Sequence, residues 1–316
     1  MREGPGRHGP LAAGERVLLV DPKGRRYLLK LVTGAQFHTH AGIIDHDGVI
    51  GADAGATITG STGRRFLVVR PTLADVVLKM PRGAQVIYPK DLGAILVAAD
   101  IGPGLRVLEA GVGSGALSMT MLRAGAEVVG YERRGDFATK AVENVTAFLG
   151  EGVAYRVEER DIYEGIEARE RGPCFDRVVL DLPEPWRVLP HAPGALVPGG
   201  IVLAYLPSVT QVAEFRAALE RGPFGMAETF ELMRRTWHVE DRAVRPDHRM
   251  VGHTGFLTTA RLLLPVPGDE DGPGAPGDGG DQGDGDRTGP GQLGPCGATA
   301  SPVASVRHQR DEGGTP

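Results

Sequence analysis

The residues best suited to chemistry stand at positions 181–186, which have the sequence Asp-Leu-Pro-Glu-Pro-Trp and directly follow the apolar run 177–180. Such a run predicts a buried strand, and the two prolines stiffen the segment after it. In an open α/β sheet, ligands bind outside the carboxyl ends of the strands. A carboxylate at Asp181 beside the flat indole of Trp186 is suited to holding a purine base.

A glycine-rich turn lies ahead of this segment, with Gly111 seventy residues before Asp181. Residues 109–115 have the sequence Glu-Ala-Gly-Val-Gly-Ser-Gly, after the apolar run 105–108 and before a segment with helical apolar spacing. A strand, a glycine turn and a helix in this order predict a loop whose backbone amides meet a nucleotide or nucleoside. The glycine spacing differs from the pattern that binds a dinucleotide pyrophosphate, which weakens that interpretation.

Two more acids follow predicted strands. Glu132 ends the run 127–131, twenty-one residues beyond Gly111, where an acid can hold both hydroxyls of a ribose. Asp161 follows residues 154–157 and precedes Ile162, which offers an apolar wall. Three successive strand ends therefore present a glycine loop, a ribose acid and an acid for the adenine edge.

These features together resemble class I S-adenosylmethionine methyltransferases, and specifically the tRNA (adenine-58-N1)-methyltransferases of bacteria and archaea. Residues 85–91 resemble the segment of that family that closes over the cofactor and the target base, and residues 237–256 resemble its terminal hairpin and tRNA-facing loop. The resemblance extends over roughly residues 10 to 265. It implies an α/β fold of the class I methyltransferase type, a Rossmann-like doubly wound sheet preceded by a small β domain.

The resemblance also implies S-adenosylmethionine as the cofactor, tRNA as the partner and a homotetrameric assembly. Its implied catalytic residue is Asp181. The implied cofactor contacts are Ile87, Glu109, Gly111, Val112, Gly113, Ser114, Gly115, Ala116, Glu132, Phe137, Asp161, Ile162 and Asp181. The implied substrate contacts are Gln85, Tyr88, Trp186, His248, Arg249 and His253. Phe137 departs from the family, which often has His or Arg there, so we expect packing or stacking in place of a polar contact.

The chemistry implied for Asp181 follows from the acceptor atom. Adenine N1 carries an in-plane lone pair and can attack a sulfonium methyl directly, but the product is cationic. A carboxylate that accepts a hydrogen bond from the N6 amino group aligns the base and stabilises that charge. The target base lies inside a folded RNA loop, so it must be turned out before N1 can be reached.

Three other functions remain open on the sequence. A methylase of exocyclic amines in nucleic acids would use a similar Asp-Pro-aromatic segment. A noncatalytic RNA-binding subunit of the same fold is the second, although the glycine loop and Asp181 are both intact. An NAD-dependent dehydrogenase fits only the fold, because no pair of residues suited to hydride transfer stands near the strand ends.

Composition predicts three regions. Residues 1–75 contain short strands at close spacing, with hairpins expected at 17–31 and at 43–50 and a further strand at 66–69, which indicates a small β domain. Residues 76–267 form the predicted methyltransferase domain. It includes a helix at 211–221 and, at 195–203, a helix end, a Pro-Gly-Gly turn and a strand. Residues 268–316 are rich in Gly, Pro and Asp, which is typical of a disordered tail.

The net charge of −5 is concentrated in that tail. Residues 268–316 carry nine acids and three arginines, a balance of −6, so the rest of the chain has a net charge of +1. Basic residues cluster in two runs that could contact phosphate: Arg64, Arg65, Arg70, Lys79, Arg82 and Lys90, then Arg234, Arg235, Arg242, Arg245 and Arg249.

Other classes of protein are disfavoured. No apolar run approaches the ~20 residues of a membrane span, and the amino terminus lacks the apolar region of a signal peptide, so we expect a cytoplasmic protein without a membrane partner. Two cysteines, Cys174 and Cys296, support neither a disulfide framework nor a metal site. His38 and His40 share a face of a predicted strand near His46, but without clustered acids or cysteines we expect no metal.

Overall fold

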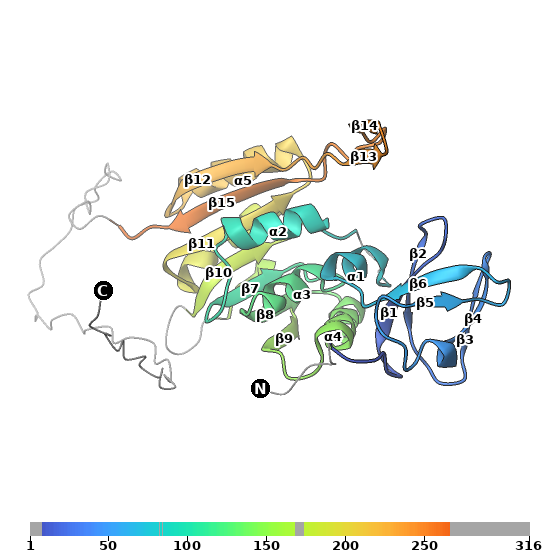
Figure 1. The fold of residues 1–316 in the computed structure, drawn as a ribbon. Coiled ribbons are helices and arrows are strands. Elements are labelled where there is room, and N and C mark those ends of the chain that lie inside the picture. The colour runs from blue at the N-terminus through green and yellow to red at the C-terminus, as the bar shows by residue number, and fades with distance from the viewer. Residues whose placement is uncertain (1–7, 82, 84, 168–173, 266–316) are drawn as a thin grey trace, which may run out of the picture. The chain divides into compact units, whose positions relative to one another are not determined.

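The computed structural model describes residues 8–81, 83, 85–167 and 174–265, and all of them belong to one compact unit, residues 1–269. The predicted tail at 268–316 lies outside the described residues. The boundary expected between residues 75 and 76 stays a prediction. The described residues form a β region near the amino end and a larger α/β region (Figure 1).

A mixed sheet of seven strands forms the centre of the α/β region, in the order β12-β15-β11-β10-β7-β8-β9. Neighbouring strands from β9 to β11 run parallel, whereas β15 runs antiparallel to both β11 and β12. The strands are β7 Arg106–Ala110, β8 Glu127–Glu132, β9 Tyr155–Glu159, β10 Phe175–Leu180, β11 Leu196–Leu206, β12 Phe224–Glu231 and β15 Phe256–Leu262. The chain order reverses between β7 and β10, which makes their carboxyl ends the expected ligand site.

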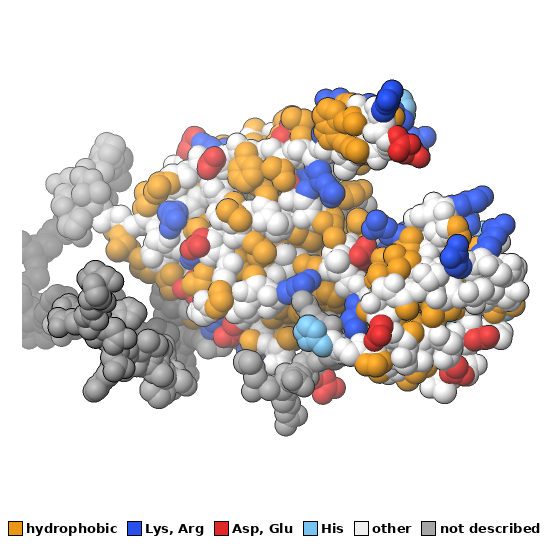
Figure 2. Space-filling model, viewed as in Figure 1, with side chains coloured by type: hydrophobic (Ala, Val, Ile, Leu, Met, Phe, Trp, Pro, Cys, Tyr) orange, Lys and Arg blue, Asp and Glu red, His pale blue; other side chains and the backbone are white. Residues whose placement is uncertain are grey.

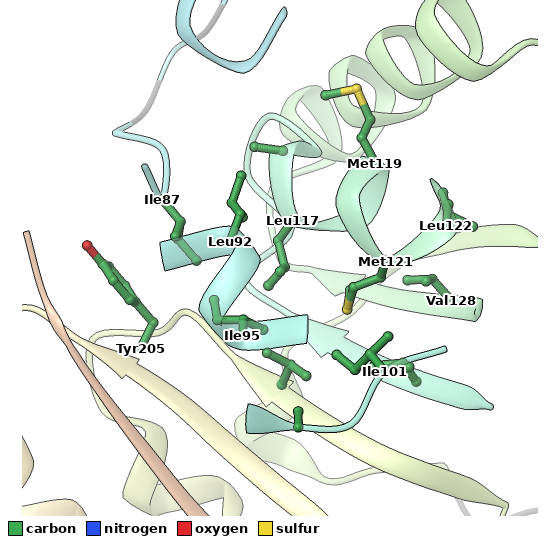
Figure 3. Close-up of a cluster of buried hydrophobic side chains, with 14 of the residues drawn as sticks. Ile87, Leu92, Ile95, Ile101, Leu117, Met119, Met121, Leu122, Val128 and Tyr205 are labelled. Carbon is green, nitrogen blue, oxygen red and sulfur yellow. The ribbon is translucent and has the colours of Figure 1, made fainter. Parts of the chain in front are cut away.

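Helices cover the sheet on both faces, as expected for a doubly wound sheet (Figure 1). They are α1 Leu73–Lys79, α2 Pro89–Ala98, α3 Ala116–Arg123, α4 Gly135–Leu149 and α5 Val209–Arg221. Side chains of β7 alternate between two cores: Val107 joins the cluster that includes α2 and α3, and Leu108 joins the cluster that includes α5. Figure 3 shows the first cluster, where Leu92 and Ile95 of α2 lie beside Leu117 and Met121 of α3.

Two helices show how the local sequence sets their limits. Gly115 has a φ of 81°, a conformation that favours glycine, and α3 begins at the next residue. Ser208 caps α5 by accepting a hydrogen bond from the Gln211 amide, and Phe215 and Leu219 bury its apolar stripe. The helix predicted at 211–221 is therefore confirmed, with its start two residues earlier.

The prediction for residues 195–203 was only partly right. β11 runs continuously through Pro198-Gly199-Gly200, so these residues belong to the strand and do not form a turn before it. The predicted helix end is present, because the 3₁₀ helix η4 Ala192–Gly194 ends there with Ala195 as its C-cap. The pairing with β10 jumps from Phe175 with Leu196 to Arg177 with Ile201, so the Pro-Gly-Gly segment is an irregularity in the strand. Gly199 has a φ of 75°, which accommodates that bulge.

The β region contains a sheet in the order β2-β1-β6-β5 and a separate hairpin of β3 with β4. The strands are β1 Arg16–Val20, β2 Arg26–Lys30, β3 Gln36–Thr39, β4 Gly42–Asp45, β5 Thr57–Thr59 and β6 Arg65–Val69. The hairpin predicted at 17–31 is confirmed, and Asp21 closes its turn by accepting from the amides of Lys23 and Arg25, each at 2.9 Å. Leu19, Phe66 and Val68 lie in a core of their own.

The hairpin predicted at 43–50 was wrong. β4 pairs with the preceding strand β3, and residues 46–48 form the 3₁₀ helix η1 His46–Gly48. The error arose because Asp-His-Asp-Gly resembles a turn, whereas His46 is buried and its Nδ1 accepts a hydrogen bond from the Val32 amide. His40 lies in the turn after β3, so it does not share a strand with His38.

The remaining elements are short. Three further 3₁₀ helices are η2 Ile162–Glu164, η3 Pro185–Val188 and η4 Ala192–Gly194, and a small hairpin joins β13 Trp237–Glu240 to β14 Ala243–Pro246. The hairpin stands within residues 232–255, the excursion between β12 and β15 that we call the arm. Within the described residues, no helix is long and apolar enough to cross a membrane.

Candidate active site

The glycine turn and the Asp181 segment meet at the point where the strand order reverses. The Asp181 amide donates to the carbonyl of Ala110 at 2.9 Å, and the Gly111 amide donates to the carbonyl of Tyr131 at 3.1 Å. A Cβ atom on Gly111 would overlap the Asp181 carbonyl oxygen. Gly111 is therefore required both by its φ of 83° and by the closeness of β10.

A cavity of about 340 Å³ opens at this point. Five of the predicted site residues line it together: Gly111, Glu132, Asp161, Ile162 and Asp181. The cavity is also lined by residues that were not predicted as ligand contacts, namely Tyr131, Arg133, Arg134, Arg160, Tyr163, Leu182 and Pro183. The arginines adjoin Glu132 and Asp161 in the chain, so their places after the strand ends were the signal that could have identified them.

Glu132 is oriented by backbone amides. Its Oε2 accepts from the Gly113 amide at 3.0 Å and its Oε1 accepts from the Arg134 amide at 3.1 Å, and the side chain is almost fully buried. Each carboxylate oxygen retains a free lone pair after these bonds. The arrangement holds a fixed acceptor pair at the cavity wall beside the glycine loop.

The acid on the next strand is also fixed. Asp161 caps η2 by accepting from the Tyr163 amide at 3.0 Å, and Arg133 lies 3.7 Å from its second oxygen. The Tyr163 hydroxyl then accepts from the Glu184 amide at 3.1 Å, and the Arg187 guanidinium lies 4.2 Å from the Tyr163 ring centre. η2 thus supports the segment that follows Asp181.

Asp181 itself has few partners. Among the described residues, no donor forms a hydrogen bond with its carboxylate. Burial, together with the nearby charge of Glu132, raises the pKa of Asp181 to about 7. A carboxylate with this pKa and with free lone pairs suits a group that binds a donor or takes up positive charge near neutral pH.

Glu109 is a second perturbed acid, directly below the glycine loop. It is fully buried, its Oε2 accepts from the Ser118 hydroxyl at 2.5 Å, and that hydroxyl in turn accepts from Tyr155 at 3.0 Å. Burial raises the pKa of Glu109 to about 8 against the opposing effect of the Ser118 hydrogen bond, with a smaller contribution from the charge of Asp181. Burial therefore favours the neutral, protonated form of Glu109 over its charged form.

Several observations fit a nucleoside cofactor with a polar chain. The Ser114 hydroxyl and Glu109 Oε1 are buried without hydrogen-bond partners among the described residues, although buried polar atoms are usually satisfied. Gly111, Gly113 and Gly115 all have φ between 55° and 83°, so the loop presents its backbone without side chains. Glu132 and Asp161 supply acceptors for hydroxyl and amino groups. The residues present therefore fit S-adenosylmethionine.

Phe137 is stacked, as expected from its departure from the family. The Arg134 guanidinium lies 3.5 Å from the centre of the Phe137 ring. The edge of the same ring also packs closely against Gly83. Phe137 and Ser114 line a second, more open cavity with Pro81, Gly83, Asp136 and Lys140. Stacking holds the Arg134 side chain in place, with its Nε 3.5 Å from Glu132 Oε1. The cofactor contact of Phe137 stays a prediction.

Other predicted site residues have side chains in the core. Ile87 and Ala116 belong to the cluster of α2 and α3, and Ile87 lies near Tyr205 (Figure 3). Val112 packs closely over Gly130 of β8, and Trp186 packs on the opposite core cluster. Ile87, Val112 and Ala116 do not line the first cavity, so their cofactor contacts stay predictions.

The predicted substrate residues are divided between two places. Gln85 and Tyr88 lie just before α2, with Tyr88 as its N-cap residue and Gln85 exposed. His248 and Arg249 are exposed on the arm, and His253 stands at the arm's end. None of these five lines either cavity, so their substrate roles stay predictions.

The basic runs are also divided. Arg64, Arg65, Lys79 and the five arginines at 234–249 are exposed, whereas Arg82 lies outside the described residues. Arg70 binds Glu15 at 3.1 Å, and Lys90 is enclosed by partners within the chain. Among the described residues, no group of three or more His, Cys, Asp or Glu side chains could hold a metal ion.

The strand order, the glycine loop and the acids at successive strand ends define a class I S-adenosylmethionine-dependent methyltransferase. Comparison with known proteins agrees and is more specific. Residues 66–245 match the family described as tRNA methyltransferase complex GCD14 subunit, and residues 9–58 match the TrmI-like N-terminal family. The chain belongs to the GCD14 family of tRNA methyltransferases.

Individual relatives are similar over nearly their whole length. The tRNA (adenine(58)-N(1))-methyltransferase TrmI of Thermus thermophilus is 40% identical over 249 residues, which cover 78% of this chain and 96% of the relative. The crystal structure of the tRNA (m1A58) methyltransferase TrmI of Aquifex aeolicus aligns with a TM-score of 0.71 at 30% identity, covering 81% of this chain and all of that one. A structure from Thermotoga maritima described as a SAM-dependent O-methyltransferase aligns with a TM-score of 0.77 at 32% identity, covering 84% and 99%.

Proposed function

We propose that this protein transfers a methyl group from S-adenosylmethionine to N1 of adenine 58 in tRNA. The observation that carries the proposal is Asp181, a partly buried carboxylate without a hydrogen-bond donor among the described residues. It lies at the junction of β7 and β10 in a chain of the GCD14 family. The names of the relatives identify adenine 58 as the nucleotide and N1 as the atom that they methylate.

In this proposal, residues at different strand ends bind different parts of the cofactor. Glu132 holds the ribose hydroxyls with lone pairs that the Gly113 and Arg134 amides leave free. Asp161 and Ile162 meet the edge and face of the adenine of the cofactor, and the loop from Gly111 to Gly115 lets the ligand approach the backbone. When bound, S-adenosylmethionine supplies a methyl group on a sulfonium, which is electrophilic without further activation.

Asp181 acts on the acceptor base. Its carboxylate accepts a hydrogen bond from the N6 amino group, which aligns the N1 lone pair and offsets the positive charge that N1 methylation leaves on the ring. A pKa of about 7 lets it take up a proton as that charge develops. Gln85 and Tyr88, before α2, are proposed to line the base pocket.

Two other acceptor atoms must be distinguished from adenine N1. One is oxygen, because the Thermotoga protein is described as an O-methyltransferase, and the other is the nitrogen of an exocyclic amine. The test is nucleoside analysis by mass spectrometry after incubation with unmodified tRNA and S-adenosylmethionine. The expected product is 1-methyladenosine, absent when adenine 58 is replaced by guanine. N6-methyladenosine or an O-methylated ribose would assign another acceptor, and a protein that binds tRNA without methylating it would be a noncatalytic subunit.

We also propose a homotetramer that acts in the cytoplasm. Large apolar side chains are exposed on and near the arm, including Met233, Trp237, Val239 and Val244, which are 56% to 69% exposed. Figure 2 shows hydrophobic side chains gathered where β12 leads into the β13–β14 hairpin. A surface of this kind favours burial against another copy. Sedimentation equilibrium should give four chains, and a monomer at micromolar concentration would refute the assembly.

A further inference from the structure

The arm leaves the sheet at the end of β12 and returns at the start of β15, so its position depends on how its two ends are held. It contains the β13–β14 hairpin and the exposed residues His248 and Arg249. Both ends are bonded to one side chain, that of Lys90 at the amino end of α2. Those contacts join residues that are separated by more than 140 positions in the chain.

All three protons of the Lys90 ammonium have acceptors. Nζ donates to Asp91 Oδ1 at 2.6 Å, to the carbonyl of Leu232 at 2.5 Å and to Thr254 Oγ1 at 2.6 Å. Thr254 Oγ1 in turn donates to Asp91 Oδ2 at 2.7 Å, which closes a ring of three side chains. An ammonium has three donors, so Lys90 has none left for phosphate.

Burial makes these contacts strong. The side chains of Lys90 and Asp91 are 9% and 1% exposed, and a buried charge without a partner is costly. One end of the arm is held at Leu232 and the other at Thr254. The ring therefore fixes both ends to α2, whose Leu92 and Ile95 are anchored in the core.

Further contacts surround the same point. The Tyr205 hydroxyl donates to the carbonyl of Thr254 at 2.6 Å, and a Cβ atom on Gly255 would overlap the Tyr205 ring. His253 bridges the two ends again, with Nδ1 3.0 Å from Glu231 and Nε2 3.0 Å from the carbonyl of Pro207. Hydrogen bonds from several side chains therefore hold both ends of the arm in place.

We propose that Lys90, Asp91 and Thr254 form a latch that fixes the arm to α2. The latch positions the arm to hold tRNA in register with the base pocket. Tyr88 precedes Lys90 by two residues, so one short segment carries both a pocket residue and the anchor of the arm. Lys90 is a positioning residue in this proposal and has no contact with the reacting atoms. The effect on tRNA rests on the proposed function, whereas the mechanical effect on the arm does not.

The test uses Thr254→Val in the full-length protein, because this change removes one hydroxyl at nearly constant shape and leaves the Lys90–Asp91 pair intact. Hydrogen exchange measured by mass spectrometry should become about tenfold faster in peptides from the arm, with peptides of β7 and β10 unchanged, since a hydrogen bond to a charged group is lost. The tRNA KM should rise about tenfold, with a smaller change in kcat. Affinity for S-adenosylhomocysteine should stay the same.

Two matched variants serve as controls. Thr254→Ser retains the hydroxyl and should behave as the wild type. Thr139→Val makes the same chemical change on α4, where the hydroxyl donates to the carbonyl of Gly135 in its own helix and has no other partner among the described residues, and it should have no effect. The double variant Lys90→Met with Asp91→Asn removes both charges together and should release the arm further than Thr254→Val without leaving a lone buried carboxylate.

The outcomes separate the two proposals. Wild-type exchange in the arm of both Thr254→Val and the double variant would overturn the latch. Faster exchange with an unchanged tRNA KM would overturn its positioning role. If the wild-type protein transfers no methyl group to tRNA, the proposed function fails, and the exchange data alone then decide whether the latch holds the arm.

Discussion

At the scale of single residues, the environment of Asp181 is distinctive because it lacks what the other acids of the site have. Glu132 and Asp161 both accept hydrogen bonds from backbone amides, whereas no described donor contacts Asp181. The three acids therefore differ in chemistry despite lying around one cavity. Glu132 and Asp161 are held in place by backbone amides, and the pKa of Asp181 is raised to about 7.

The pH dependence of methylation should report Asp181. If the carboxylate form is required, kcat/KM rises with pH as the proton is lost, with its midpoint near pH 7. Asp181→Asn should be about a hundredfold slower and independent of pH in this range, with S-adenosylmethionine affinity retained. Single-turnover methylation at several pH values makes the measurement. Glu109→Gln is the control, since the midpoint should survive the loss of this second acid; near-normal transfer by Asp181→Asn would exclude the mechanism.

Glu132→Gln should weaken cofactor binding, because the amide presents one acceptor in place of two to the ribose hydroxyls. A lost hydrogen bond of this kind costs about 1 to 3 kcal/mol, and calorimetric titration with S-adenosylhomocysteine measures it. Glu127→Gln is a matched control at the other end of the same strand, where Glu127 binds Arg106 at 2.8 Å. Equal affinities for the two variants would remove Glu132 from the cofactor site.

At the scale of elements, the site depends on the junction between the glycine loop and β10. Gly111→Ala should abolish most cofactor binding, since the added methyl overlaps the Asp181 carbonyl and forces β7 and β10 apart. Gly104→Ala is a close control, because Gly104 has a φ of 82° against 83° for Gly111 but has open space around its Cβ position. Binding affinity and melting temperature together separate backbone strain from the clash. Equal losses in both variants would show that strain alone is responsible.

The arm should show a pH dependence of its own through His253. A carbonyl and a carboxylate both accept, so both ring nitrogens must carry protons, and the hydrogen bonds to Pro207 and then Glu231 raise the pKa of His253, while the charge of Lys90 opposes the shift. A raised folded pKa gives stabilisation that is complete below the ordinary value of 6.5 and is lost as pH rises through the folded pKa.

The measurement is the difference in melting temperature between the wild type and His253→Gln, taken at pH values from below to above the pKa of His253. The difference should be largest in mild acid and shrink at higher pH. His248→Gln, on the exposed part of the arm, should give a constant difference. A constant difference for His253→Gln as well would show that His253 does not hold the arm as an imidazolium.

Sequence patterns predicted some of these elements better than others. Glu132 and Asp181 directly follow apolar runs, and Asp161 comes four residues after the run 154–157, so strand ends and site could be located together from these three acids. The turn-like composition of residues 45–48 led to the wrong prediction of a hairpin, because the burial of His46 outweighs the local preference for a turn. The Lys90 contacts could not be foreseen at all, since nothing near residue 90 indicates that residues 232 and 254 return to it.

At the scale of the whole molecule, charge is distributed unevenly along the chain. The three core clusters consist of residues from Leu11 to Leu262, whereas most of the excess negative charge belongs to residues 268–316. Removing residues 268–316 changes the net charge from −5 to +1 and leaves every core side chain of the described residues in place. We therefore expect little change in melting temperature or turnover on truncation.

Calorimetry and methylation assays of the truncated protein test this expectation. In both forms, tRNA affinity should fall as salt increases, because phosphate contacts release counterions. Aggregation of the truncated protein, or loss of most of its activity, would show that the domain boundary near residue 267 is wrong.

The place of β15 in the sheet has a consequence for synthesis of the protein. β12 is made before β15, yet β15 is its only partner in the described sheet, and β15 also completes the free side of β11. During translation, β12 therefore waits with both edges unpaired until residues 256–262 have emerged from the ribosome. Unpaired edges template aggregation, so this interval is when the nascent chain is most exposed to it. A chain that stops short of residue 256 should be captured by chaperones or degraded, even though its glycine loop and all three acids have already been made.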